Sequence, residues 1–189
     1  MRFYAACLAS YNAGVLHGAW IEASDDVAEM QMEVNAMLRA SPFPNVTVTH
    51  PVTGESVPSA EEWAIHNHEG FGGDLAEYAG LAKVAQLFTL NEVAEDHDIP
   101  LCILRDAMND ATADLDRAEE FISDRYRGTA DTWADFAEEF TRDTHDMSTV
   151  PDFLQNHIDW HSMGREFEMC GDFSGIRHDG EKLYIFWNH

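Results

Sequence analysis

Acidic side chains recur at four-residue intervals along this sequence, and this spacing constrains the chain more than any other feature. Residues 106–124, DAMNDATADLDRAEEFISD, contain two such series: Asp106, Asp110 and Asp114, and then Asp116, Glu120 and Asp124. Residues four apart lie on one face of a helix, so each series would form a row of like charges. Each such pair weakens an isolated helix by about a few tenths of a kcal/mol. Helix stability alone gives no reason for this arrangement.

Similar rows are predicted on other helices. Their acids are Asp25, Glu29, Glu33, Glu92, Asp96, Asp131, Asp135, Glu139 and Asp143, with Glu138 beside the last row. Few cations lie close enough to neutralise them, Arg117 and Arg142 being the exceptions. Four helical residues rise about 6 Å, and phosphates on a DNA strand are roughly 6–7 Å apart along the winding path. We therefore predict a partner-binding surface that imitates phosphates and includes Asp106, Asp110, Asp114, Asp116 and Glu120 as well.

The net charge agrees with this hypothesis. The chain has 35 Asp and Glu residues against 11 Lys and Arg residues, which gives a net charge of −24. Duplex DNA carries two charges per base pair, so the chain matches about 12 base pairs and a two-fold dimer about 24. Such a chain should repel nucleic acid and anionic membranes, and it should attract basic protein surfaces.

Two other interpretations of the rows remain open. An acidic row is most often a solvated helix face with no partner. Proteins from salt-loving organisms are also rich in acids and poor in lysine, and only Lys83 and Lys182 occur in this chain. By spacing alone, a solvated face or a halophile's binding or structural domain is favoured over a phosphate mimic. A protein of the halophile kind should unfold when salt is removed, whereas a phosphate mimic should stay folded.

No motif for catalysis or cofactor binding stands out. The sequence has no HExxH motif, no cysteine near a histidine at zinc-site spacing, no phosphate-binding loop and no GxSxG motif. His157 and His161 stand four apart, but scattered surface histidines explain the ten histidines better than a metal site. We therefore expect no catalytic site, no metal and no cofactor. An acid-rich hydrolase or metalloenzyme, the remaining alternative, would need a convergent polar pocket.

The cysteines bear on the cellular compartment. Cys7, Cys102 and Cys170 are widely spaced and odd in number, which argues against a disulfide scaffold and fits a reducing cytoplasm. No stretch reaches the length of a membrane span, and the first residues do not resemble a signal peptide. We expect a cytoplasmic protein.

Hydrophobic periodicity predicts an α+β fold with small antiparallel sheets at both ends and a helical middle. We expect an N-terminal α+β domain at 1–69, a helical domain at 70–118 and a C-terminal α+β domain at 119–189. In the first domain, the pattern predicts strands at 2–10 and 15–23, a helix at 24–38 capped by Ser24, a proline-rich loop at 41–58 with one short strand, and a strand within 61–68.

The rest of the chain is predicted to contain mainly helices. They are expected at 74–88, from Thr89, from near Leu104, at 129–143 with Thr129 as the cap, and from Asp152 past His161. Residues 126–128 should end the middle region, and residues 119–127 could be helix or strand. A hairpin that turns at Asp179 and Gly180 closes the chain.

Several stretches together resemble the ArdA-type antirestriction proteins. They are YAACLASYNAGVLHGAWIEA (4–23), EEWAIHNHEGFGG (61–73), LAEYAGL (75–81), YRGTADTWADFAEEF (126–140) and IDWHSMGREFEMCGDF (158–173). They occur in order along nearly the whole chain. Asn67 and His68 stand where an acidic and an aromatic residue are expected, and Glu166 stands where Asp is expected. The proline-rich loop is also longer than usual, but these departures are local.

The resemblance implies a specific function. Members are non-enzymatic DNA mimics from plasmids, transposons and phages, built as elongated dimers of three-domain chains. They occupy the DNA-binding groove of type I restriction–modification enzymes, so the expected partner is the methyltransferase core. The expectation includes a homodimer and no direct binding of nucleic acid. KLYIFW, residues 182–187, and the helices before it are candidates for the dimer contact. The acidic rows would then exist to be recognised as phosphates.

Overall fold

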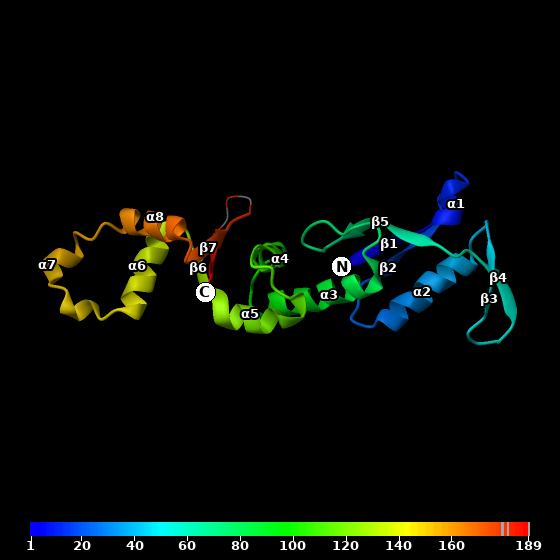
Figure 1. The fold of residues 1–189 in the computed structure, drawn as a ribbon, viewed down its shortest axis with the longest axis horizontal. Coiled ribbons are helices and arrows are strands. Elements are labelled where there is room, and N and C mark those ends of the chain that lie inside the picture. Colours follow the sequence, from blue (N-terminus) through cyan, green and yellow to red (C-terminus); the bar gives the residue numbers. More distant parts are fainter. Residues whose placement is uncertain (179, 181, 189) are drawn as a thin grey trace. The chain divides into compact units, whose positions relative to one another are not determined.

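The computed structural model describes residues 1–178, 180 and 182–188. The chain divides into two compact units, Met1–Cys102 and Ile103–His189 (Figure 1). Each unit combines helices with a small antiparallel sheet. The α+β class and the sheets at both ends of the chain are therefore confirmed. The finer division into three domains at residues 69/70 and 118/119 remains a prediction.

The sheet of the first unit has the strand order β2-β1-β5. Its strands are β1 (Arg2–Cys7), β2 (Gly18–Glu22) and β5 (Trp63–Glu69), and both pairings are antiparallel. All three predicted strands are confirmed. The first strand ends at Cys7, earlier than expected, because residues 8–12 form the short helix α1 (Leu8–Asn12). Ser10 of this helix is buried and shares a hydrogen bond of 2.9 Å with the Ser41 hydroxyl.

Helix α2 (Val27–Arg39) lies against this sheet and buries an apolar face made of Met30, Val34, Met37 and Leu38. The expected Ser24 cap is wrong. The helix begins at Val27, so Asp26 occupies the N-cap position, and its carboxylate accepts hydrogen bonds from the backbone N–H groups of Ala28 and Glu29.

The proline-rich segment contains a two-stranded hairpin where one short strand was expected. The hairpin consists of β3 (Val46–Thr49) and β4 (Ser56–Ser59), with Thr47 opposite Pro58. Proline argues against a central strand because it has no N–H to donate. In a sheet of two strands, each strand has an open edge, and the missing donor is tolerated there.

Two predicted middle helices are a single helix, α3 (Gly80–Asp96). Its buried residues, Leu81, Val84, Leu87, Leu90 and Ala94 among them, continue through Thr89 without a break, so the capping pattern at Thr89 is not used. Residues 74–79, expected to be helical, instead lie along the free edge of β5, where the Ile65 N–H donates to the Glu77 carbonyl at 2.9 Å.

The helix expected from near Leu104 through Ala118 is interrupted. Helix α4 (Leu101–Asp110) ends at Asp110, and Thr112 has a left-handed φ of 51°. The short 3₁₀ turn η1 (Leu115–Arg117) and helix α5 (Ala118–Arg125) follow. The open question for residues 119–127 is settled as helix up to Arg125 and strand from Tyr126.

The second unit has a sheet with the order β6-β8-β7. Its strands are β6 (Tyr126–Ala130), β7 (Phe173–Ile176) and β8 (Leu183–Trp187). Residues 126–128 therefore follow the end of the helical stretch at Arg125, as expected, and they begin a strand. The closing hairpin of β7 and β8 is confirmed, while Asp179, expected in its turn, lies outside the described residues.

Helices α6 (Trp133–Thr144) and α8 (Trp160–Cys170) pack together in this unit. The cap of α6 is Thr132, because Thr129 is part of β6. The predicted helix from Asp152 past His161 is broken: η2 (Met147–Thr149) and α7 (Asp152–Gln155) precede α8. Five aromatic residues fill the core near α6, α8 and β7: Trp133, Phe136, Phe140, Phe167 and Phe173.

The crossing of α6 and α8 depends on Gly164. A Cβ at this position would lie 2.5 Å from the backbone carbonyl of Trp133 and 2.7 Å from the backbone nitrogen of Ala134. We expect Gly164→Ala to lower the free energy of unfolding by about 1–3 kcal/mol, because the backbone of α6 must move away. Chemical denaturation measures the loss. Gly180→Ala is a poor control because of its left-handed φ, whereas Glu168→Ala on the exposed side of α8 is suitable. A Gly164→Ala protein as stable as the parent would contradict this packing.

Candidate partner-binding surface

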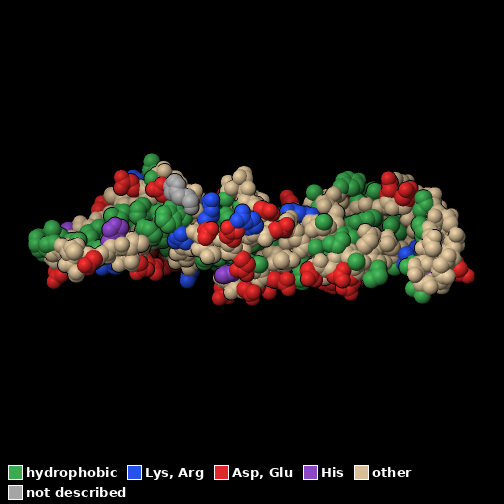
Figure 2. Space-filling view, turned by 60° about the horizontal axis from the view of Figure 1, so that its bottom comes forward, with side chains coloured by type: hydrophobic (Ala, Val, Ile, Leu, Met, Phe, Trp, Pro, Cys, Tyr) green, Lys and Arg blue, Asp and Glu red, His purple; other side chains and the backbone are tan. Residues whose placement is uncertain are grey.

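The predicted carboxylates lie on the surface of both units. Figure 2 shows Asp and Glu side chains exposed over both parts of the chain, with few Lys and Arg side chains among them. Of the predicted acids, all are exposed except Glu138, which is half-buried. Exposed carboxyl groups are ionised at neutral pH. The surface is therefore available to a partner and strongly negative.

The helical rows are shorter than the sequence predicted. Asp25 precedes α2, Asp131 precedes α6, and Asp114 follows the end of α4. Each row loses one member because the helix begins after that residue or ends before it. The pairs that do share a helix face are Glu29 and Glu33 on α2, Glu92 and Asp96 on α3, and Asp106 and Asp110 on α4.

The second row of residues 106–124 begins outside the helix as well. Asp116 lies in η1, whereas Glu120 and Asp124 lie four apart on α5. Arg117 forms an ion pair with Glu120, so this carboxylate is partly neutralised. Asp106 has a partner too, because His178 Nε2 lies 2.9 Å from its carboxylate. The predicted surface is thus not uniformly free of counter-charges.

Helix α6 carries the longest row. Asp135, Glu139 and Asp143 are exposed at four-residue intervals. Asp135 also accepts a hydrogen bond of 2.6 Å from the Thr132 hydroxyl, which fixes it at the start of the helix. Two further acids on the helical surface, Glu95 on α3 and Glu119 on α5, were missed because they stand outside the four-residue spacing. Their exposure places them on the same kind of surface.

Glu138 differs from the other acids of α6. It accepts a hydrogen bond from Arg142 Nε at 3.0 Å, and Arg142 Nη2 lies 2.8 Å from the same carboxylate. The Arg142 guanidinium also lies over the Trp160 ring, 5.8 Å from its centroid. The ion pair lies within α6, and Arg142 reaches α8 through its contact with the Trp160 ring. Glu138 is thus partly neutralised, unlike the exposed acids of the row.

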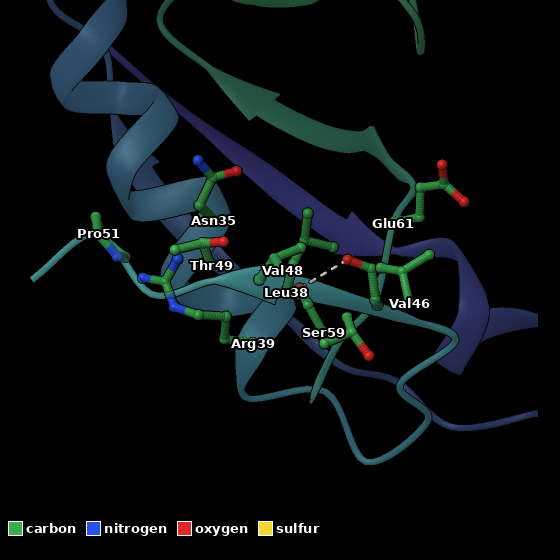
Figure 3. A pocket seen from close by; sticks show the side chains of 11 residues that line it. Asn35, Leu38, Arg39, Val46, Val48, Thr49, Pro51, Ser59 and Glu61 are labelled. Atoms are coloured by element: carbon green, nitrogen blue, oxygen red, sulfur yellow. Dashed lines mark hydrogen bonds between the residues drawn. The ribbon is translucent and has the colours of Figure 1, made fainter. Parts of the chain in front are cut away.

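Metal-binding clusters and cavities are the other candidate sites in the described part of the chain. There, no group of three or more His, Cys, Asp or Glu side chains is placed to hold a metal ion. A cavity of about 480 Å³ lies between α2 and the β3–β4 hairpin, with Arg39 beside Thr49 and with Glu61 on another side (Figure 3). Its lining contains one carboxylate, Glu61, and the hydroxyls of Thr47, Thr49 and Ser59, of which the Ser59 hydroxyl donates to the Ala60 carbonyl at 2.8 Å. No described helix is long and apolar enough to cross a membrane.

The expected dimer contact at residues 182–187 is mostly occupied within its own unit. Leu183, Ile185 and Phe186 of β8 are buried in the core. Only Lys182 and Trp187 are exposed there. The apolar side chains of KLYIFW therefore stabilise this unit, because side chains on one face of a strand pack against the helices that lie on that face of the sheet.

Comparison with known protein families gives one match. A family model described as antirestriction protein (ArdA) matches residues 3–181. No curated protein shows a significant match to the chain. The family match covers both units and all of the helices on which the acidic pairs lie.

Proposed function

Because this chain belongs to the ArdA family of antirestriction proteins, we propose that it mimics B-form DNA and blocks the DNA-binding groove of type I restriction–modification enzymes. The site of action would be the methyltransferase core, which must hold DNA before either methylation or cleavage. Restriction enzymes of this kind act on DNA inside the cell, so the protein would act in the cytoplasm. Incoming DNA from a mobile genetic element would thereby be protected from restriction.

The observation that carries this proposal is the row on α6. Asp135, Glu139 and Asp143 are exposed on one helix face at a rise of about 6 Å per step. A DNA-binding groove is lined with cations that are spaced to meet phosphates. The same cations would attract these carboxylates through the same screened electrostatic interaction. Such an inhibitor needs no catalytic group, and it would act by occupying the groove.

A competition assay tests the proposal. The purified chain would be titrated into a complex of a type I methyltransferase core with a labelled duplex that contains its target site. We expect the chain to displace the duplex, and added salt to weaken the displacement because exposed charges are screened. A duplex that stays bound at a large excess of the chain would contradict DNA mimicry. A parallel melt without added salt should show a folded protein, whereas unfolding would favour the halophile interpretation.

We also expect a two-fold homodimer with an elongated shape. One chain carries the charge of about 12 base pairs, and two copies carry that of about 24, which is comparable to the footprint of a large DNA-binding enzyme. Small-angle scattering at micromolar concentration should give twice the mass of one chain and a maximum dimension well above that of a sphere of this mass. A spherical monomer at that concentration would contradict the prediction.

A further inference from the structure

An exposed group of aromatic and acidic side chains lies in the first unit, away from the acidic pairs on the helices. It consists of Tyr11, His66, Glu77 and Tyr78, and we call it the tyrosine patch. The Tyr11 side chain is 52% exposed and that of Tyr78 is 71% exposed. The Tyr11 and His66 rings meet edge to face, with centroids 4.8 Å apart. His66 Nε2 in turn lies 3.6 Å from a carboxylate oxygen of Glu77.

The backbone holds three distant segments together at this patch. The Leu8 N–H at the start of α1 donates to the Glu62 carbonyl at 3.0 Å, which ties α1 to the residue before β5. The Ile65 N–H of β5 donates to the Glu77 carbonyl at 2.9 Å. Tyr11, His66 and Tyr78 therefore stand on a sheet and its two attached segments. The patch is presented on a scaffold and not on a free loop.

The patch comes from the stretches that carry the family resemblance and that the acidic rows leave unexplained. Tyr11 lies in 4–23, His66 in 61–73, and Glu77 and Tyr78 in 75–81. Single exposed apolar residues are ordinary on a protein surface. Two exposed tyrosines that are linked through His66 and Glu77 are less ordinary, because tyrosine is enriched among the residues that dominate binding energy at interfaces.

The charge around the patch is negative. The carboxylate of Glu77 raises the pKa of Tyr78 above its ordinary value, with partial burial and then Glu62 adding to the effect. A negative carboxylate opposes formation of the tyrosinate, so the direction of the shift fits the two groups being neighbours. A cation that reached this place would meet both a ring face and a carboxylate. A phosphate or an anionic lipid would be repelled.

We propose that the tyrosine patch binds arginine side chains of a cationic protein partner. A guanidinium group stacks on an aromatic ring through its plane and donates hydrogen bonds to a carboxylate at its edge, which a lysine ammonium does less well. Tyr11 and Tyr78 supply the rings, and Glu77 supplies the carboxylate. The proposal rests on the proposed function only for the identity of that partner, which would be the restriction–modification enzyme.

The tyrosine patch would contribute to partner binding in a different way from the acidic rows. Charge attraction between exposed groups weakens steeply with salt, whereas stacking on a ring depends less on long-range charge. The rows would draw a basic groove toward the protein, and the tyrosine patch would retain arginines at contact. Binding that survives at high salt is therefore the property that belongs to the patch.

A peptide titration tests this inference without the enzyme. The probe is a capped hexa-arginine peptide, added to the full chain in 0.5 M NaCl and followed by NMR of the aromatic and histidine signals. We expect the Tyr11, His66 and Tyr78 signals to shift, and a capped hexalysine peptide to bind more weakly. In the double variant Tyr11→Ala/Tyr78→Ala, affinity for hexa-arginine should fall by about tenfold, since two ring contacts are lost.

Three further variants separate the contributions of the rings, the hydroxyls and the neighbouring carboxylate. Tyr11→Phe/Tyr78→Phe keeps both rings and should bind hexa-arginine within about twofold of the parent, because stacking needs the ring and not the hydroxyl. Phe153→Ala removes an aromatic ring that is 69% exposed in the other unit and should leave the affinity unchanged. Glu77→Gln should lower the pKa of Tyr78 toward its ordinary value. Thermal melts should show all variants folded, because both tyrosines are exposed.

Unchanged hexa-arginine binding in the double alanine variant would overturn the inference, as would equal affinity for hexalysine and hexa-arginine. The proposed function fails separately. If the parent chain does not displace DNA from the methyltransferase core, DNA mimicry is wrong, while the peptide result still decides the chemistry of the patch. If the parent displaces DNA and the double alanine variant does so equally well in high salt, the patch has no part in binding the enzyme.

Discussion

Neutralising the acidic row at α6 is expected to weaken binding to a type I methyltransferase core by about one to two orders of magnitude. The variant combines Asp131→Asn, Asp135→Asn, Glu139→Gln and Asp143→Asn. Each exposed charge contact contributes at most about 1 kcal/mol, and about 1.4 kcal/mol corresponds to a tenfold change in affinity. Any single change should therefore have little effect. The dependence of affinity on salt should also become shallower, because fewer ionic contacts are screened.

Stability should change little in this variant. Removing like charges four residues apart stabilises a helix by about a few tenths of a kcal/mol per pair. Asp135 lies in the first turn of α6, where a negative charge is favourable, so its loss acts in the opposite direction. Binding titrations at several salt concentrations and a thermal melt measure the two effects separately. Equal losses of stability and binding would mean that these acids maintain the fold.

The matched control removes the same charge elsewhere. Glu55→Gln, Asp152→Asn, Glu166→Gln and Glu168→Gln change four exposed acids that lie outside the predicted rows. The control variant has the same net charge as the row variant, so a general loss of attraction would appear in both. We expect the control to keep most of its affinity. If both variants lose affinity equally, net charge alone governs binding, and the spacing of the row has no role.

Phe136→Ala should have the largest effect on stability. The Phe136 side chain is 4% exposed and contacts the rings of Phe140, Phe167 and Phe173, with centroids between 5.1 and 6.0 Å away. Replacing a buried phenylalanine by alanine costs about 3–5 kcal/mol, because the apolar contacts are lost and a cavity remains. This change would remove much of the stability of an ordinary domain. Because α6 lies on this core, we expect binding through its acidic row to weaken as the unit unfolds.

Denaturant unfolding measures the effect, and Phe153→Ala is the matched control. Phe153 is an exposed phenylalanine of the same unit, so its removal should cost less than about 0.5 kcal/mol. A Phe136→Ala protein that loses no more than this control would show that the aromatic core is not packed as described. At a temperature where the Phe136→Ala protein is still folded, it should compete with DNA for the methyltransferase core as well as the parent does, since the acids themselves are unchanged.

Local sequence patterns predicted those helices and strands that depend mainly on interactions between residues close in sequence. The strands β1, β2, β5, β7 and β8 were predicted from local patterns, and the apolar stripe of α2 was predicted by its 3.6-residue period, whereas β6 was not predicted. The residues at which the helices begin were not predicted correctly. Ser24 and Thr129 both have good capping chemistry, but Asp26 and Thr132 are the caps, because tertiary packing sets where each helix begins. Hence Asp25 and Asp131 lie outside the helical rows.

The charge, the exposure of most acids and the membership of the ArdA family could all be predicted from the sequence, since they depend on residue types and on local spacing. Which side chains contact one another depends on the tertiary structure. The pairing of Asp106 with His178 joins residues that are 72 positions apart, and the tyrosine patch joins three separate segments. No periodicity encodes such contacts, because they arise when a sheet brings distant backbone segments into register.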